Sequence, residues 1–329
     1  MVMEVKRRAL YNLLQMNWCQ DKKMDVQPWQ VENYRCLASG ELFAKLHELG
    51  IHMDKDNFTS FAEAYDTPEE LADGLASDDG DASLQDRIYL VVFELWRQLF
   101  PERRALTVFC DELDHQISHY DNHEAENFEG VQDILAVLQK TLEETADSGE
   151  DAKELFCVIT EHCANDIETF LFDFIAGQLD ESNDDYAFEL IEEFYLYVQN
   201  VKWFDFLRAR LVANSDIDRA NKMLRSLIEK SVCKPDIEFN FEMLFFLAHC
   251  GDKSLFIQLV KQTFSQITVE EELLELMNDC VDFFESVDME KEAYKVDKIL
   301  ASRQKMPLDN SVNLADPDVA YFLTIIEAL

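Results

Sequence analysis

Glycine and proline are scarce in this chain. Its 329 residues include 8 glycines and 6 prolines, well below the usual shares of about 7% and about 5%. Folds with many tight turns depend on these two residues, so their scarcity disfavours sandwiches, barrels and glycine-loop α/β folds. No two glycines lie closer than six residues. This spacing excludes the phosphate-binding loop, the dinucleotide-binding motif and the GxSxG motif of serine hydrolases.

Basic residues are also few, with 29 Lys and Arg against 67 Asp and Glu and a net charge of −38. An anionic surface repels phosphate backbones and anionic lipid heads, so we expect neither nucleic-acid nor membrane binding. The sequence has no apolar run approaching about 18 residues and no convincing signal-peptide core. Its eight cysteines lie singly, without a CxxC pair, as is typical of free thiols in a reducing compartment. These features together predict a cytoplasmic protein.

Helical periodicity is what the sequence has in abundance. Hydrophobic residues make up 48% of the chain, and 24 of them are Phe. Residues 131–143 place their apolar side chains on one helix face, and residues 88–99 predict a strongly apolar helix that stops before Pro101. The pattern predicts an all-α protein in which helices are joined by short polar loops.

Several residues mark the ends of these helices. Gly50 is placed to end one helix, and Thr67 is placed to begin another, with Glu70 completing a capping box. Ser215 is predicted to cap a helix over 215–228. Thr268 opens a helix that runs to about residue 286, again with a capping-box Glu at position 271.

A polar loop at residues 145–151, TADSGED, is the best candidate for a domain boundary. It predicts an N-terminal helical domain over 1–145 and a C-terminal domain of helical hairpins over 151–329. In the second domain an aromatic helix end, a polar break and an apolar restart recur at 194–207, 245–256 and 283–294. This organisation resembles the architecture of α-solenoids such as tetratricopeptide and HEAT proteins, although the spacing is irregular and the tetratricopeptide signature is absent. A large helical bundle is the alternative.

Charge is strongly segregated along the chain. Residues 111–193 contain 25 acids but only two bases, Lys140 and Lys153. This acidic block is either a surface for a basic protein or a solvated face that maintains solubility. Further along, Arg219, Lys222 and Arg225 are three residues apart and lie along one helix face. We call these three residues the basic stripe; it is predicted to bind an acidic peptide or phosphate, or to dock against the chain's own acids.

One cluster has the side chains of a metal site. Asp111, His115, His119 and His123 recur every four residues, which puts a carboxylate and three imidazoles on one helix face. Two neighbouring members could share a zinc or iron ion. The alternative is a polar surface helix that is rich in histidine, because neither HExxH nor a second Glu-x-x-His accompanies the cluster.

Aromatic clusters at 170–174, 194–197, 203–206, 245–246 and 283–284 belong either to the core or to a groove for hydrophobic peptides. The sequence as a whole predicts a non-enzymatic interaction protein, a scaffold, adaptor or chaperone-like factor that holds another protein, basic in character, on an acidic helical surface. We expect such an interaction protein to need no cofactor. The alternatives are a metal-dependent enzyme that uses the face of His115 and His119, and a secreted bacterial effector or its chaperone.

Overall fold

The computed structural model describes residues 6–76, 81–103, 105–122, 129–250 and 252–328. These residues fold into 17 α-helices and two short 3₁₀ helices. The β-type pairing within these ranges is limited to an isolated bridge between Val269 and Ser311. The all-α prediction is therefore confirmed. None of the described helices is long and apolar enough to cross a membrane.

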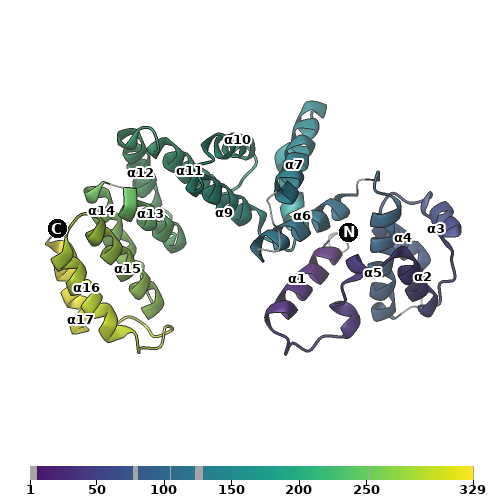
Figure 1. Cartoon of the computed structure of the whole chain (residues 1–329), viewed down its shortest axis with the longest axis horizontal. Helices are drawn as coiled ribbons and strands as arrows, with labels where there is room; N and C mark the ends of the chain where they lie inside the picture. The colour runs from purple at the N-terminus through teal and green to yellow at the C-terminus, as the bar shows by residue number, and fades with distance from the viewer. Residues whose placement is uncertain (1–5, 77–80, 104, 123–128, 251, 329) are drawn as a thin grey trace. The chain divides into compact units, whose positions relative to one another are not determined.

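The chain divides into two compact units, Met1–Leu171 and Phe172–Leu329 (Figure 1). Residues 145–151, predicted as a loop and domain boundary, lie inside the first unit; residues 145–148 are the last turn of one helix, and 149–151 join it to the next. The elements of the first unit are α1 (Arg7–Gln20), η1 (Pro28–Gln30), η2 (Tyr34–Cys36), α2 (Ser39–Glu48), α3 (Lys55–Ala62), α4 (Pro68–Leu75), α5 (Ala82–Leu99), α6 (Leu106–Asp121), α7 (Glu129–Ser148) and α8 (Ala152–His162).

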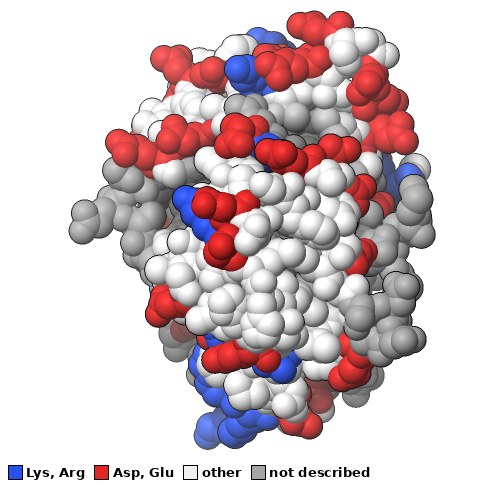
Figure 2. Space-filling model, turned by 90° about the vertical axis from the view of Figure 1, so that its right-hand side faces the viewer, with Lys and Arg blue, Asp and Glu red and all other residues white. Residues whose placement is uncertain are grey.

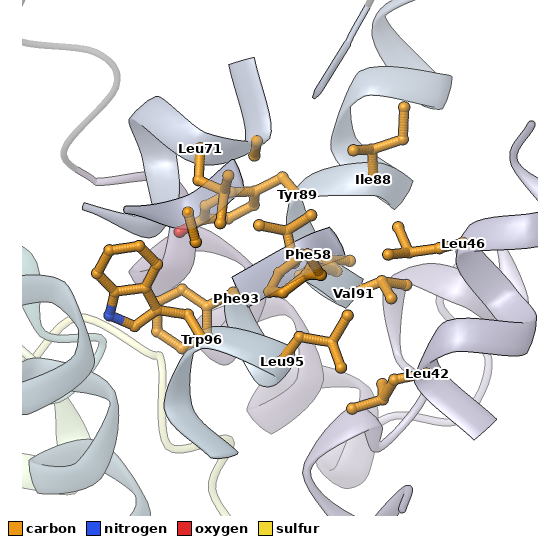
Figure 3. Packing of buried hydrophobic residues seen from close by; sticks show 14 of the residues in the cluster. Leu42, Leu46, Phe58, Leu71, Ile88, Tyr89, Val91, Phe93, Leu95 and Trp96 are labelled. Carbon is orange, nitrogen blue, oxygen red and sulfur yellow. The ribbon is translucent and has the colours of Figure 1, made fainter. Parts of the chain in front are cut away.

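The core of the first unit forms around α5, which packs against α2, α4 and η2. Every residue from Ile88 to Trp96 is buried, so this helix is enclosed on all sides, as its apolar sequence predicts. Figure 3 shows Phe58, Leu71 and Leu46 from the surrounding helices meeting Phe93 and its neighbours on α5. Each such side chain contributes about 1.5–3 kcal/mol to stability through burial.

The second unit is a succession of helices that pack on their neighbours. Each of the pairs α11–α12, α13–α14 and α15–α16 is in contact, and α13 also contacts both α11 and α15. Helix α9 begins in the first unit and continues into the second. The helices are α9 (Ile167–Asp180), α10 (Asp184–Phe194), α11 (Val201–Ala213), α12 (Ile217–Ser231), α13 (Ile237–Cys250), α14 (Lys253–Phe264), α15 (Glu270–Ser286), α16 (Glu290–Arg303) and α17 (Pro317–Glu327).

The predicted helix ends are largely confirmed, with shifts of one residue. Gly50 has a φ of +88° after α2, the left-handed conformation that glycine adopts at low cost. Thr67 accepts a hydrogen bond from the N–H of Glu70 at 3.2 Å. The cap of α12 is Asp216, which accepts from the N–H of residue 219 at 3.0 Å; the prediction of Ser215 was wrong because the neighbouring carboxylate reaches that donor.

Helix α15 also begins one position later than predicted. The carboxylate of Glu272, rather than the acid at 271, accepts hydrogen bonds from the N–H groups of Thr268 at 2.7 Å and Val269 at 3.2 Å.

Acids are spread widely over the surface. On the face in Figure 2, Asp and Glu side chains surround a broad area of uncharged residues, and many of the visible Lys and Arg gather at its lower edge.

Candidate functional site

A groove of about 320 Å³ in the first unit is lined by α1, by residues 32–35 and by α6. Three of the four predicted metal ligands, Asp111, His115 and His119, line this groove together. The prediction that they share a helix face is therefore confirmed for these three. His123 lies outside the described residues.

Asp111 lies at the centre of a buried network of ion pairs. Its carboxylate is 3% exposed and accepts from Arg8 Nε at 2.6 Å and from an Arg35 guanidinium nitrogen at 2.9 Å. Arg8 also pairs at 3.2 Å with Glu94, which is fully buried, and Asn12 donates to Asp111 at 3.1 Å. Asp111 and Glu94 therefore each have a cationic partner, which is the condition under which burial of a charge is tolerated.

These pairs decide the protonation of the groove. Burial raises the pKa of Asp111, but the adjacent Arg8 and Arg35 outweigh that effect and lower the pKa overall. Burial and the nearby Arg35 lower the pKa of His115 to about 4, so its imidazole is neutral near pH 7. The rings of His115 and His119 lie 4.2 Å apart.

The oxygens of Asp111 face arginines, so they do not point to a shared metal ion. Across the described residues, no three His, Cys, Asp or Glu side chains are grouped closely enough to hold such an ion. The metal site therefore stays a prediction. Arg8 and Arg35 were missed at the sequence level because nothing in the sequence pairs them with a residue on α6.

The basic residues of α11 and α12 differ in their partners. The three on α11 are held in ion pairs: Lys202 pairs with Asp236, Arg208 with Glu192 at 2.6 Å, and Arg210 with Asp180 at 2.6 Å.

The basic stripe, Arg219, Lys222 and Arg225, is exposed on α12. Within the described part of the chain, its side chains make no ion pair. Its role in partner binding stays a prediction.

A second group of acids, on α13 and α15, contrasts with the Asp111 network. Asp279 is 8% exposed, and its Oδ2 atom has no hydrogen-bond partner among the described residues. Burial raises the pKa of Asp279 to about 8, and the neighbouring carboxylates Glu275, Asp282 and Glu242 add to that effect. We call these four residues the acidic face.

Two other members of the acidic face, Glu242 and Glu275, also have raised pKa values. Partial burial raises the pKa of Glu242, and Arg210 only partly offsets this rise because Asp173 and Glu275 act in the opposite direction. Burial together with Glu271 and Glu272 also raises the pKa of Glu275. Carboxylates without adequate cationic partners hold protons that they would release in water, so this face favours an added positive charge.

A groove of about 370 Å³ adjoins the acidic face through Glu242. Its apolar lining includes Leu179, Phe245 and Phe246, and the side chain of Phe245 is 60% exposed. Most other predicted aromatic clusters belong to the core; the buried residues are Phe170, Phe172, Phe174, Phe194, Phe204, Phe206, Phe283 and Phe284. An exposed aromatic ring beside a carboxylate with a raised pKa is more typical of a surface than of a core.

Sequence reasoning missed the acidic face because the acidic block was assigned to 111–193, whereas these acids lie on later helices. One signal was present in the sequence. Asp279 lies three residues after Leu276 and four before Phe283, so it falls on the apolar stripe of its own helix. An acid at such a position is buried with the stripe and needs an explanation.

The chain was compared with known proteins. No family model, no curated protein and no solved structure matches it. The chemistry of its surfaces is therefore the basis for a functional assignment.

Proposed function

We propose that this chain is a non-enzymatic, cytoplasmic interaction protein, a scaffold or adaptor that holds a basic partner protein on its second unit. The observation that carries the proposal is the acidic face: Glu242 and Glu275 are exposed on α13 and α15, and with Asp282 they add to the raised pKa of the buried Asp279. A cationic group of a partner placed over the exposed acids would supply the missing counter-charge.

The helix packing of the second unit supports this proposal. We propose that α9 to α16 form an irregular α-solenoid, because sequential helices pair and the alternate helices α11, α13 and α15 also contact one another. In such a stack one set of helices makes a continuous surface. Residues on α13 and α15 then act together, which is consistent with the mutual influence of Glu242 and Asp279.

The charge of the whole chain favours the same class of partner. A net charge of −38 attracts basic proteins over long distances and repels polyanions. The exposed Phe245 supplies an apolar anchor, so affinity would not depend on charge alone. The eight cysteines, all of which are free thiols, support a cytoplasmic setting.

The test compares two doubly charge-reversed variants of the full chain. Glu242→Lys/Glu275→Lys alters the acidic face, whereas Glu229→Lys/Asp297→Lys makes the same charge change at exposed positions on α12 and α16. Each protein is used to capture partners from a lysate at about 0.05 M and about 0.5 M salt, because screening weakens charge-driven binding, and captured proteins are identified by mass spectrometry.

We expect the wild type and the α12/α16 variant to capture the same basic proteins at low salt. The acidic-face variant should lose them, and high salt should weaken all capture. Equal capture by the two variants, or partners without a basic bias, would contradict the proposal.

A further inference from the structure

Two cysteines of the first unit, Cys110 and Cys163, have no part in the proposed function. They are 53 positions apart in the sequence. Cys110 lies near the start of α6, and Cys163 directly follows α8, in the short segment that leads to α9. Both are free thiols. Cys110 is 1% exposed, whereas Cys163 is partly exposed, so an oxidant in solvent reaches Cys163 first.

The fold brings these two thiols into contact. Cys163 Sγ is 3.9 Å from the carbonyl oxygen of Cys110. Cys110 Sγ is 3.9 Å from the carbonyl oxygen of Ile159, which also accepts from the N–H of Cys163 at 3.2 Å. The two thiols also hydrogen-bond each other. A disulfide needs Cβ atoms about 3.5–4.5 Å apart, and thiols in hydrogen-bonding contact are within a short movement of that geometry.

The backbone beside Cys163 is held in place by Asp114 on α6. The buried carboxylate of Asp114 accepts from the N–H groups of Ala164 at 2.8 Å and Asn165 at 3.0 Å. Asp114 follows Cys110 by four residues, about one helical turn. The same stretch of α6 therefore contacts both the second thiol and the amides next to it. Such positioning favours a bond within the chain over a reaction with another molecule.

We propose that Cys110 and Cys163 form an oxidation site, at which a peroxide converts the two thiols into a disulfide that fastens α6 to the segment between α8 and α9. This inference is independent of the proposed function. In a reducing setting the pair stays as thiols until an oxidant arrives.

The reaction uses one hydrogen peroxide molecule as the two-electron oxidant. The sulfur of Cys163 attacks one peroxide oxygen and the O–O bond breaks. The departing hydroxide takes up the thiol proton as water, which leaves a sulfenic acid on Cys163. The sulfur of Cys110 then attacks that sulfenic sulfur, and the sulfenic hydroxyl leaves with the proton of Cys110 as a second water.

The surroundings of the pair make both its formation and its reduction slow. The hydrogen bond with Cys110, burial and the carboxylates of Asp114 and Asp111 raise the pKa of Cys163, so little of the reactive thiolate is present near pH 7. A thiol with a raised pKa is also a poor leaving group when a disulfide is reduced. The disulfide should therefore form under sustained exposure to peroxide and then persist.

The experiment treats the full chain with excess hydrogen peroxide near pH 7 and near pH 9, blocks the remaining thiols and identifies linked peptides by mass spectrometry. Digestion after glutamate cuts at Glu161 and so separates Cys157 from Cys163. We expect a peptide that joins Cys110 to Cys163. It should form at least about tenfold faster near pH 9, because the thiolate fraction rises with pH below the pKa.

A second measurement tests whether the bond fastens α6. Hydrogen exchange of the backbone amides in α6 should slow by about tenfold or more after oxidation, because the new bond closes a long loop, and a dithiol reductant should reverse the change. Cys163→Ser should abolish both the linked peptide and the slower exchange. The matched control, Cys157→Ser, alters a partly exposed thiol on α8 and should retain both.

The linked peptide is read on the wild type, so the result does not depend on how the variants fold. The proposal is overturned if Cys163 accumulates as sulfinic acid without a link to Cys110, or if it pairs mainly with Cys157 or with a second chain. It is also overturned if the exposed cysteines oxidise while Cys163 stays a thiol. A linked peptide without slower exchange in α6 would show that the bond does not fasten this helix.

Discussion

Both units of this protein bury carboxylates, and two of these, Asp111 and Asp279, have opposite surroundings. Asp111 in the first unit is paired with Arg8 and Arg35, and its pKa lies below the ordinary value because those arginines outweigh burial. Asp279 in the second unit meets other carboxylates, and burial raises its pKa to about 8. The first arrangement stabilises the ionised form, whereas the second one works against it.

This difference is the reason for proposing a structural role for Asp111 and a binding role for the acidic face. A buried ion pair that is complete within the chain has little capacity for an outside ligand, since its donors and acceptors are already used. A buried carboxylate without a cationic neighbour can still be stabilised when a partner supplies a positive charge. The proposed function therefore rests on the acidic face, although the groove around Asp111 contains the histidine cluster that the sequence analysis singled out.

The largest expected effect comes from breaking the complete network. Asp111→Ala leaves Arg8 with one partner, Glu94, in a site where its side chain is 11% exposed. We expect a loss of about 3–5 kcal/mol in the free energy of unfolding of the first unit, as is usual when one member of a buried ion pair is removed. Hydrogen exchange of the backbone amides in α1, α5 and α6 measures the stability of the first unit separately from that of the second. Asp133→Ala, at an exposed position on α7, should cost less than about 0.5 kcal/mol, and a loss below about 1 kcal/mol for Asp111→Ala would show that the network is not structural.

A comparable effect of opposite sign is expected at Asp279. Its folded pKa of about 8 lies above the unfolded value of about 3.9. As pH rises between these values the unfolded chain ionises while the folded chain keeps its proton, so the free energy of unfolding of the second unit falls. Asp279→Asn removes that loss and should stabilise this unit by about 4 kcal/mol more near pH 8 than near pH 4.

Denaturant titrations followed by hydrogen exchange in α13 and α15 at the two pH values check this prediction. The matched control is Asp297→Asn on α16, an exposed acid whose replacement should leave the pH dependence unchanged. If Asp279→Asn destabilises the second unit at both pH values, Asp279 is a satisfied structural acid and the contrast with Asp111 disappears.

The sequence predicted the fold class well because helical periodicity is a local property. The apolar helix at 88–99 and the caps at Gly50 and Thr67 depend on residues within a few positions of one another. The shared face of Asp111, His115 and His119 is equally local. The sequence therefore predicted which side chains meet along one helix.

Contacts between distant segments were beyond that reasoning. Arg8 lies 103 positions from Asp111, and the association of Glu242 with Asp279 depends on how α13 packs against α15. Helical spacing carries no information about such pairs, so the arginines beside the histidine-rich helix and the acidic face went unnoticed. The unusual position of Asp279 on an apolar stripe was the one available signal, and the charge count of 111–193 drew attention away from it.

The smallest stability effect is expected at the basic stripe, and it extends the comparison to cations. Arg208 and Arg210 are held in ion pairs, whereas Arg219, Lys222 and Arg225 are exposed. Replacing all three stripe residues by Ala should change the free energy of unfolding by less than about 0.5 kcal/mol, as measured by denaturant titration. Arg210→Ala, the matched variant on α11, removes a cation that lowers the pKa of Glu242 and should cost more, because it leaves another carboxylate of the acidic face uncompensated. If the triple variant costs as much as Arg210→Ala, the stripe has a structural partner within the chain, and its exposed charges cannot be counted as a surface for an acidic ligand.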